Sequence, residues 1–314
     1  VGVLVWTRAV LLVPMVVVGL GVLVLLVVVD PHTTPITAHM SDREFARLWA
    51  LACVCAGLVM IVSAIVCQFI APSIRMMSAL ITAASCVIIM SIGACFYYPP
   101  ATAPTDPTWS WLVNALALVV AVGACAVAFS PLLSIKIARV QIPVLPTSGQ
   151  DLSVSDTNMD DVPRQAQVAH AVLEGIVLGL GCALVPAILV VCAWAPQRHF
   201  SFALAVCLCL SFMLHAQRHH GWLSTWALWL PALAAAGGTA LVATAPGTHV
   251  AVIILAFLVV SAAATAPGWA PHLTNLEPTT VVWIERAEVL SIAACLPLAL
   301  HIVGLFTLLR GLAL

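Results

Sequence analysis

Residues 175–194 read GIVLGLGCALVPAILVVCAW, a run of twenty residues without a charged side chain. A helix needs about 20 mostly apolar residues to cross the hydrocarbon core of a bilayer. This run, extended to Ala169–Trp194, is therefore predicted to be a membrane-spanning helix. Comparable runs recur along the chain, so the bilayer, rather than a water-soluble core, is expected to decide the fold.

The composition extends this interpretation to the whole chain. Of its 314 residues, 63% are hydrophobic and only 7% are charged, and the mean hydropathy is +1.15. A soluble domain carries about 25% charged residues and could not bury this much apolar side chain. The net charge of −1 offers no basic surface of the kind that binds nucleic acid. We therefore expect an all-α, polytopic transmembrane helix bundle.

About nine stretches are predicted to span the membrane. They are Ala9–Val29, Leu48–Ile70, Met76–Tyr98, Trp109–Ile135, Ala169–Trp194, His199–His215, Trp222–Ala245, Val250–Trp269 and Glu288–Leu309. A loop rich in proline and aspartate, residues 138–167, interrupts the series. The chain therefore divides into a first group of four spans in residues 1–137, this loop, and a second group of five spans in residues 168–314.

The basic residues set the predicted orientation. With the N-terminus in the cytoplasm, seven of the eleven Lys and Arg residues lie on the inner side and four on the outer side. Cytoplasmic loops of membrane proteins carry the excess of basic residues. We therefore predict a multi-pass protein of the inner (plasma) membrane. Its N-terminus and the loop 138–167 lie in the cytoplasm, and its C-terminus lies outside.

The eleven cysteines are expected to be packing residues. All of them fall within apolar stretches, and no CxxC motif is present. Cysteines two apart, such as Cys53 and Cys55, leave nearly opposite sides of a helix and cannot chelate an ion together. A buried cysteine behaves as a small apolar side chain. We therefore expect neither disulfides nor a zinc site.

Three histidines lie close together in residues 214–222, LHAQRHHGW. His215 and His219 are four apart and would share a helix face, as metal ligands do. The glutamate of an HExxH motif is missing, and the stretch, which also contains His220, offers no obvious third ligand. Gly221 indicates that the helix ends here. We therefore favour a short polar turn at the lipid head groups over a metal site.

Three ionisable residues are predicted to lie within spans: Glu174, Glu288 and His301. Such residues are functional candidates because burying them at membrane depth is costly. Both carboxylates, however, lie within about two turns of the predicted cytoplasmic surface, where a side chain can reach water or cap a helix. We therefore favour structural roles for both, and a hydrogen-bonded packing role for His301.

Small residues and missing motifs complete the residue-level picture. Gly175 and Gly179 share one face of the fifth span and are predicted to allow close helix packing, within a subunit or across a dimer. Nucleotide-binding fingerprints and nucleophile elbows are not found in the sequence. We therefore expect no enzymatic activity, no catalytic residue and no cofactor.

Two parts of the sequence resemble the EccD family, the polytopic membrane component of actinobacterial type VII (ESX) secretion systems. The first is Ala138–Pro146, ARVQIPVLP, where an arginine at a helix end precedes two nearby prolines and a long polar loop. The second is the tail, with the segments Glu277-Pro278, Trp283-Ile284-Glu285, 296–300 (LPLAL), Gly304-Leu305-Phe306 and Arg310. The resemblance covers Ala138–Leu314, and five helices follow the loop as in the family. Residues 1–137 resemble the family in topology only.

The resemblance implies a non-catalytic scaffold. Family members form dimers and assemble with EccB, EccE and the FtsK/SpoIIIE-like ATPase EccC to export WXG100 and PE/PPE proteins. The partner-contact candidates are Lys136, Arg139, Pro143 and Pro146, and membrane lipids are further partners. EccD proteins also carry an N-terminal ubiquitin-like domain and two more spans, which we expect to be absent from this chain.

Two other functions stay open at this point. A secondary transporter for a small solute would use Glu174, Glu288 or His301 as coupling groups, but no internal repeat supports it. A membrane-embedded acyl- or glycosyltransferase would use intramembrane histidine and arginine, but a catalytic loop is not evident. The dispensability of the intramembrane ionisable groups separates these functions from a scaffold.

The predicted topology can be tested by labelling two loops. Cysteines are introduced at Thr105 and Ser148 in a variant whose native cysteines are replaced. An impermeant maleimide added outside should label position 105 alone, because position 148 lies in the cytoplasmic loop. The reverse pattern would contradict the orientation.

Overall fold

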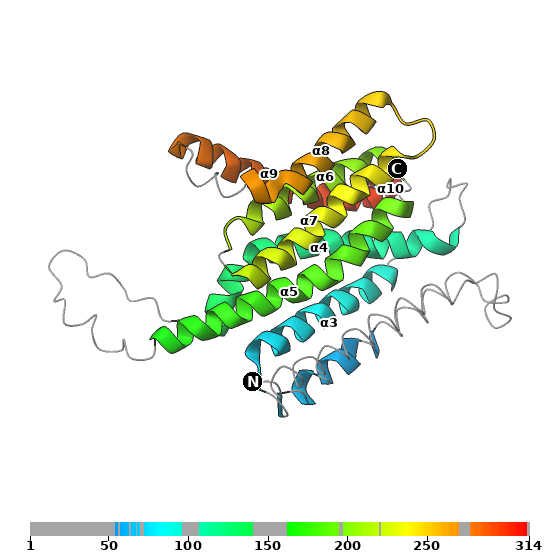
Figure 1. The fold of residues 1–314 in the computed structure, drawn as a ribbon. Coiled ribbons are helices and arrows are strands. Elements are labelled where there is room, and N and C mark those ends of the chain that lie inside the picture. The colour runs from blue at the N-terminus through cyan, green and yellow to red at the C-terminus, as the bar shows by residue number, and fades with distance from the viewer. Residues whose placement is uncertain are drawn as a thin grey trace, which may run out of the picture.

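The computed structural model describes most residues between 54 and 69 and the ranges 72–95, 107–140, 162–194, 197–219, 221–269 and 277–312. In these ranges the regular structure is α-helical. The described residues between 54 and 69 are helical, and the helices after them are α3 (Ile74–Cys95), α4 (Pro107–Ile137), α5 (Val162–Trp194), α6 (Arg198–Ala216), α7 (Trp222–Ala243), α8 (Val250–Trp269), α9 (Pro278–Ile302) and α10 (Leu305–Leu312). Figure 1 shows them gathered side by side, with the N-terminal end of α5 projecting from the bundle. The all-helical class is confirmed.

Six of the predicted spans each correspond to a single helix, α3 to α8, with ends that differ by at most three residues except at the start of α5, which lies seven residues earlier than predicted. Four stretches are long and apolar enough to cross a membrane: Val113–Ile137, Pro163–Trp194, Arg198–Ala216 and Trp222–Ala243. The stretch Ala9–Val29 lies outside the described residues, and Leu48–Ile70 lies only partly within them. The number of nine spans therefore stays a prediction.

The last predicted span, Glu288–Leu309, has the wrong bounds. The structure begins α9 ten residues earlier, at Pro278, and separates α9 from α10 at Val303 and Gly304. Proline is favoured in the first turn of a helix, where its missing N–H leaves no hydrogen bond unmade. Gly304 has a φ of 82°, in the left-handed region that stops a helix.

The core is built around α5, which packs against α3, α4 and α7, while α9 packs against α6 and α4. The largest fully buried side chains come from five helices. They are Leu80, Val120, Val127, Leu180, Leu184, Ile188, Leu204, Leu208, Phe212 and Leu228. Alanines fill many of the remaining buried positions, so the helices approach one another closely.

Glycines set how near α5 lies to its neighbours. A Cβ added at Gly179 would lie 2.4 Å from the carbonyl oxygen of Ala79 in α3, and one at Gly175 would lie 2.3 Å from that of Arg75. On another side of α5, a Cβ at Gly181 would lie 2.4 Å from the carbonyl oxygen of Ala227 in α7. Backbone atoms cannot rotate away as side chains do. These contacts between α5 and its two neighbours therefore require glycine.

Alanine substitutions at two helical glycines test this packing. Gly179→Ala should lower the midpoint of thermal unfolding in detergent, because forced overpacking costs about 1–3 kcal/mol. Gly237→Ala in α7 is the matched control, since a Cβ there meets nothing within 4 Å. The control should be neutral or stabilising, because alanine is the better helix former by about 1 kcal/mol. Equal midpoints for the two variants would show that the α3–α5 contact tolerates a methyl group.

Candidate functional site

The first charged group of interest joins α3 to α5. Glu174, whose side chain is only 7% exposed, lies with Oε2 2.5 Å from Nη2 of Arg75 in the first turn of α3. This is a contact of opposite charges rather than an aligned hydrogen bond. One turn earlier on α5, His170 Nε2 lies 3.4 Å from the other carboxylate oxygen. The buried carboxylate is therefore partnered from two helices.

This ion pair depends on the glycine next to it. Gly175 brings the backbone of Arg75 against α5, and the Arg75 side chain can then reach Glu174. The same carboxylate approaches the turn before α7, where a Cβ on Gly221 would lie 3.0 Å from Glu174 Oε1. Three segments that are distant in sequence thus meet at one buried charge.

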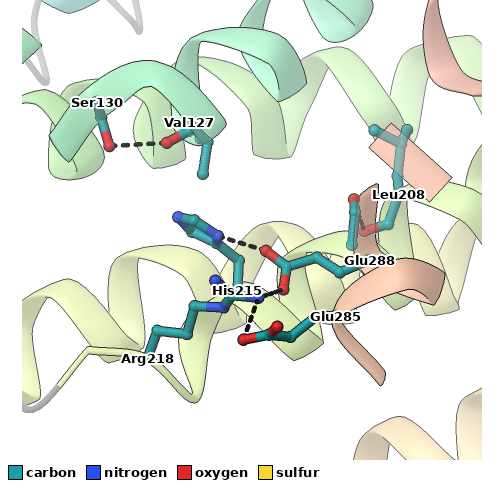
Figure 2. A network of polar contacts seen from close by, with 8 residues as sticks. Val127, Ser130, Leu208, His215, Arg218, Glu285 and Glu288 are labelled. Carbon is teal, nitrogen blue, oxygen red and sulfur yellow. Dashed lines mark hydrogen bonds and ion pairs between the residues drawn. The ribbon is translucent and has the colours of Figure 1, made fainter. Parts of the chain in front are cut away.

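A second charged network joins α6 to α9 (Figure 2). Glu288 Oε1 lies 2.7 Å from Nδ1 of His215, and its Oε2 lies 2.7 Å from Nη2 of Arg218. Glu285, one turn earlier on α9, lies 3.7 Å from the same Arg218 nitrogen. The ring of His219 packs edge-on against His215, with centroids 5.3 Å apart. Glu288 and His215 are both buried.

Local sequence explains the geometry of the second network. His215 and Arg218 lie at the C-terminal end of α6, where the helix dipole favours positive charge. Glu285 and Glu288 are three apart and therefore leave α9 on one face. The two donors offset much of the desolvation cost of the buried carboxylate, and the loss of one partner would leave an unpaired buried charge, which is strongly destabilising. The network therefore stabilises the packing of α9 on α6.

The structure separates the three predicted ionisable candidates. Glu174 and Glu288 each belong to one of the two networks. The His301 ring instead contacts the rings of Phe200 and Phe306, at centroid distances of 3.8 and 5.9 Å. Phe200 is in the first turn of α6, whereas the Glu288 partner His215 is in its last turn, about 22 Å away along the helix axis. His301 therefore does not share a cavity with Glu288.

The end of α4 carries two of the predicted partner-contact residues. Lys136 lies in the last turn, and Arg139 follows the helix with a φ of 53°. The N–H of Arg139 donates to the Lys136 carbonyl and that of Val140 to the Ile135 carbonyl, at 3.2 Å each. These are the two hydrogen bonds of a Schellman cap, with Arg139 in the position that glycine usually takes. Pro143 and Pro146 lie outside the described residues.

Sequence reasoning missed the partners of the buried carboxylates. Arg75, Arg218 and Glu285 are not among the ionisable candidates predicted from sequence, although each of them belongs to one of the networks. A signal existed for His170, which is four residues before Glu174, and for the spacing between Glu285 and Glu288. The contact between Arg75 and Glu174 had none, because it depends on how α3 packs. Of the three neighbouring histidines in residues 214–222, His215 pairs with Glu288, and His220 lies outside the described residues.

Comparisons with known proteins agree with this fold. No curated protein matches the chain. Among solved structures, "Structure of protomer 1 of the ESX-3 core complex" is similar with a TM-score of 0.58 and 16% identity, over 96% of this chain and 75% of that one. At that identity the similarity shows the fold alone. The family described as EccD-like transmembrane domain matches residues 34–312, which is most of the chain. The resemblance to EccD is thereby confirmed, and the chain belongs to the family with the EccD-like transmembrane domain.

Proposed function

We propose that this protein is a non-catalytic scaffold in the membrane assembly of a type VII (ESX) secretion system. The family match over residues 34–312 carries the proposal, and the fold of the ESX-3 core complex protomer supports it. In this proposal the chain crosses the plasma membrane about nine times, with spans in residues 1–137 and 168–314 and a cytoplasmic loop at 138–167. Its N-terminus is cytoplasmic and its C-terminus external.

The paired charges favour a scaffold over a secondary transporter. A coupling group in a transporter must exchange its proton, ion or partner during each cycle. Glu288 is held by His215 and Arg218 together, and Glu174 is held by Arg75 beside a glycine contact between backbones. Such pairs fix helices to one another. His301 contacts two phenylalanine rings near the other end of α6, which suits a packing role.

The end of α4 is the surface that we assign to cytosolic partners. α4 has 31 residues and α5 has 33, so they are about 46 and 50 Å long, against about 30 Å for the hydrocarbon core. Both helices must therefore extend beyond the core, and in the predicted orientation they extend into the cytoplasm at the loop 138–167. Lys136, Arg139, Pro143 and Pro146 lie on this extension or directly after it.

The conformation of Arg139 supports a role for its side chain. A left-handed conformation costs a non-glycine residue about 1 kcal/mol, and glycine would avoid this cost. Strained residues of this kind cluster at functional sites. We therefore assign Arg139 to contact with the ATPase EccC or with EccB and EccE. A second copy of the chain and membrane lipids complete the proposed partners, and the exported proteins are of the WXG100 and PE/PPE kinds.

Substitutions at Arg139 separate the backbone effect from the side-chain effect. Arg139→Gly should preserve or raise the midpoint of thermal unfolding, because glycine suits the left-handed position. The same variant should release the ATPase-containing complex during native gel electrophoresis. Arg139→Lys is the matched control, which retains the charge and should stay assembled. If the glycine variant remains fully assembled, the Arg139 side chain has no part in partner contact.

Substitutions at the buried ionisable residues distinguish a scaffold from a transporter. Glu174→Gln should lower stability by about 1–2 kcal/mol, because Arg75 loses its partner but remains partly solvated. Glu174→Gln and His301→Ala should nevertheless leave protein export intact at permissive temperature. Export of a WXG100 substrate into the medium is the measurement, with membrane levels of the variant as the control. Loss of export from normally assembled Glu174→Gln complexes would favour the transporter.

A further inference from the structure

A cavity of about 190 Å³ lies where the first turn of α6 meets the turn between α7 and α8. Its lining divides by chemistry. Phe202, Val242 and Val252 supply apolar surface, and Arg198, His199, Gly247, Thr248 and His249 supply the rest. Three side chains that can carry positive charge therefore surround one apolar cavity.

The turn between α7 and α8 is built to hold this shape. Gly247 has a φ of 76°, which favours glycine. Arg198 Nη1 donates a 2.8 Å hydrogen bond to the carbonyl oxygen of Pro246, which ties α6 to the turn. Thr248 Oγ1 donates to the carbonyl oxygen of Ala245 at 2.6 Å. One hydrogen bond therefore ties the first turn of α6 to the turn after α7, and the other holds that turn itself in shape.

Positive charge and free donors remain available at the cavity. A guanidinium has five N–H donors, and the bond to Pro246 uses one of them. The first turn of α6 receives no hydrogen bond from a capping side chain, because Gln197 at the N-cap makes none. Backbone N–H groups there carry the positive end of the helix dipole. Among the described residues, the carboxylates with ion pairs lie in the two networks already described, of which one joins α3 to α5 and the other involves the opposite end of α6.

We propose that this cavity binds the phosphate group of an anionic phospholipid. Arg198, His199 and His249 would contact the phosphate, since arginine is the preferred partner of phosphate oxygens. The apolar part formed by Phe202, Val242 and Val252 would pack against the start of an acyl chain, which a free phosphate ion lacks. The site lies at one end of α6 and α7, both of which are long and apolar enough to cross a membrane, so the proposal places it at the level of the lipid head groups. It does not depend on the proposed secretion function.

The experiment measures thermal unfolding of the purified full chain in a neutral detergent with added lipid. Phosphatidylglycerol should raise the midpoint of unfolding by several degrees in a saturable way, since a ligand that binds only the folded state stabilises it. Zwitterionic phosphatidylcholine should give a much smaller shift. Inorganic phosphate at millimolar concentration is a third arm, and it should give little shift. An equal saturable shift with inorganic phosphate would overturn the assignment to a lipid and would identify the ligand as a free anion.

Two variants make the assignment specific to the cavity. Arg198→Gln with His249→Gln should weaken the apparent affinity for phosphatidylglycerol at least tenfold. His199→Gln with His249→Gln leaves the Arg198–Pro246 bond in place and should weaken it several-fold, which guards against a folding defect in the first variant. Arg310→Gln is the matched control, because Arg310 is exposed on α10 and is not part of the cavity lining. Wild-type shifts in both cavity variants would overturn the proposal.

Discussion

The close backbone approach between α3 and α5 is the constraint on which much of the described structure depends. It requires glycine at positions 175 and 179, where any side chain would meet carbonyl groups of α3. The Arg75 guanidinium reaches the buried Glu174 only because this approach exists. A third glycine, at 181, repeats the arrangement against α7. Since apolar side chains gain nothing from leaving lipid for each other, packing of this kind must supply much of the association between helices.

The sequence alone predicted the helical class and located six helices from their apolar runs. It failed at the last span because Glu285, Arg286 and Glu288 resemble the polar edge of a membrane helix. In the structure they lie inside one long helix, where Glu288 is buried against α6. The sequence alone cannot distinguish a buried charge that is neutralised by a partner distant in sequence from a charge that faces water.

The candidate site shows the same limit of sequence reasoning. Glu174 and Glu288 stood out because buried carboxylates are costly, yet their partners could not be identified. Arg75 and Glu174 are about a hundred residues apart, and only the packing of α3 on α5 brings them together. The cavity beside Arg198 is equally invisible in sequence, because its walls come from the start of α6, the end of α7, the turn after it and the start of α8. Local spacing predicts a helix face but not the helix that covers it.

The Glu288 network anchors α9 at one point, and a small tilt about that point displaces the beginning of the helix. The network fixes α9 to α6 at Glu288, and the preceding turns carry the exposed Val282 and Trp283. Pro278 lies about 15 Å from this pivot along the helix axis. A tilt of about 10° at the pivot would move the start of α9 by roughly 2–3 Å while the core stayed in place. A force on Trp283 would therefore act on the contact of Glu288 with His215 and Arg218.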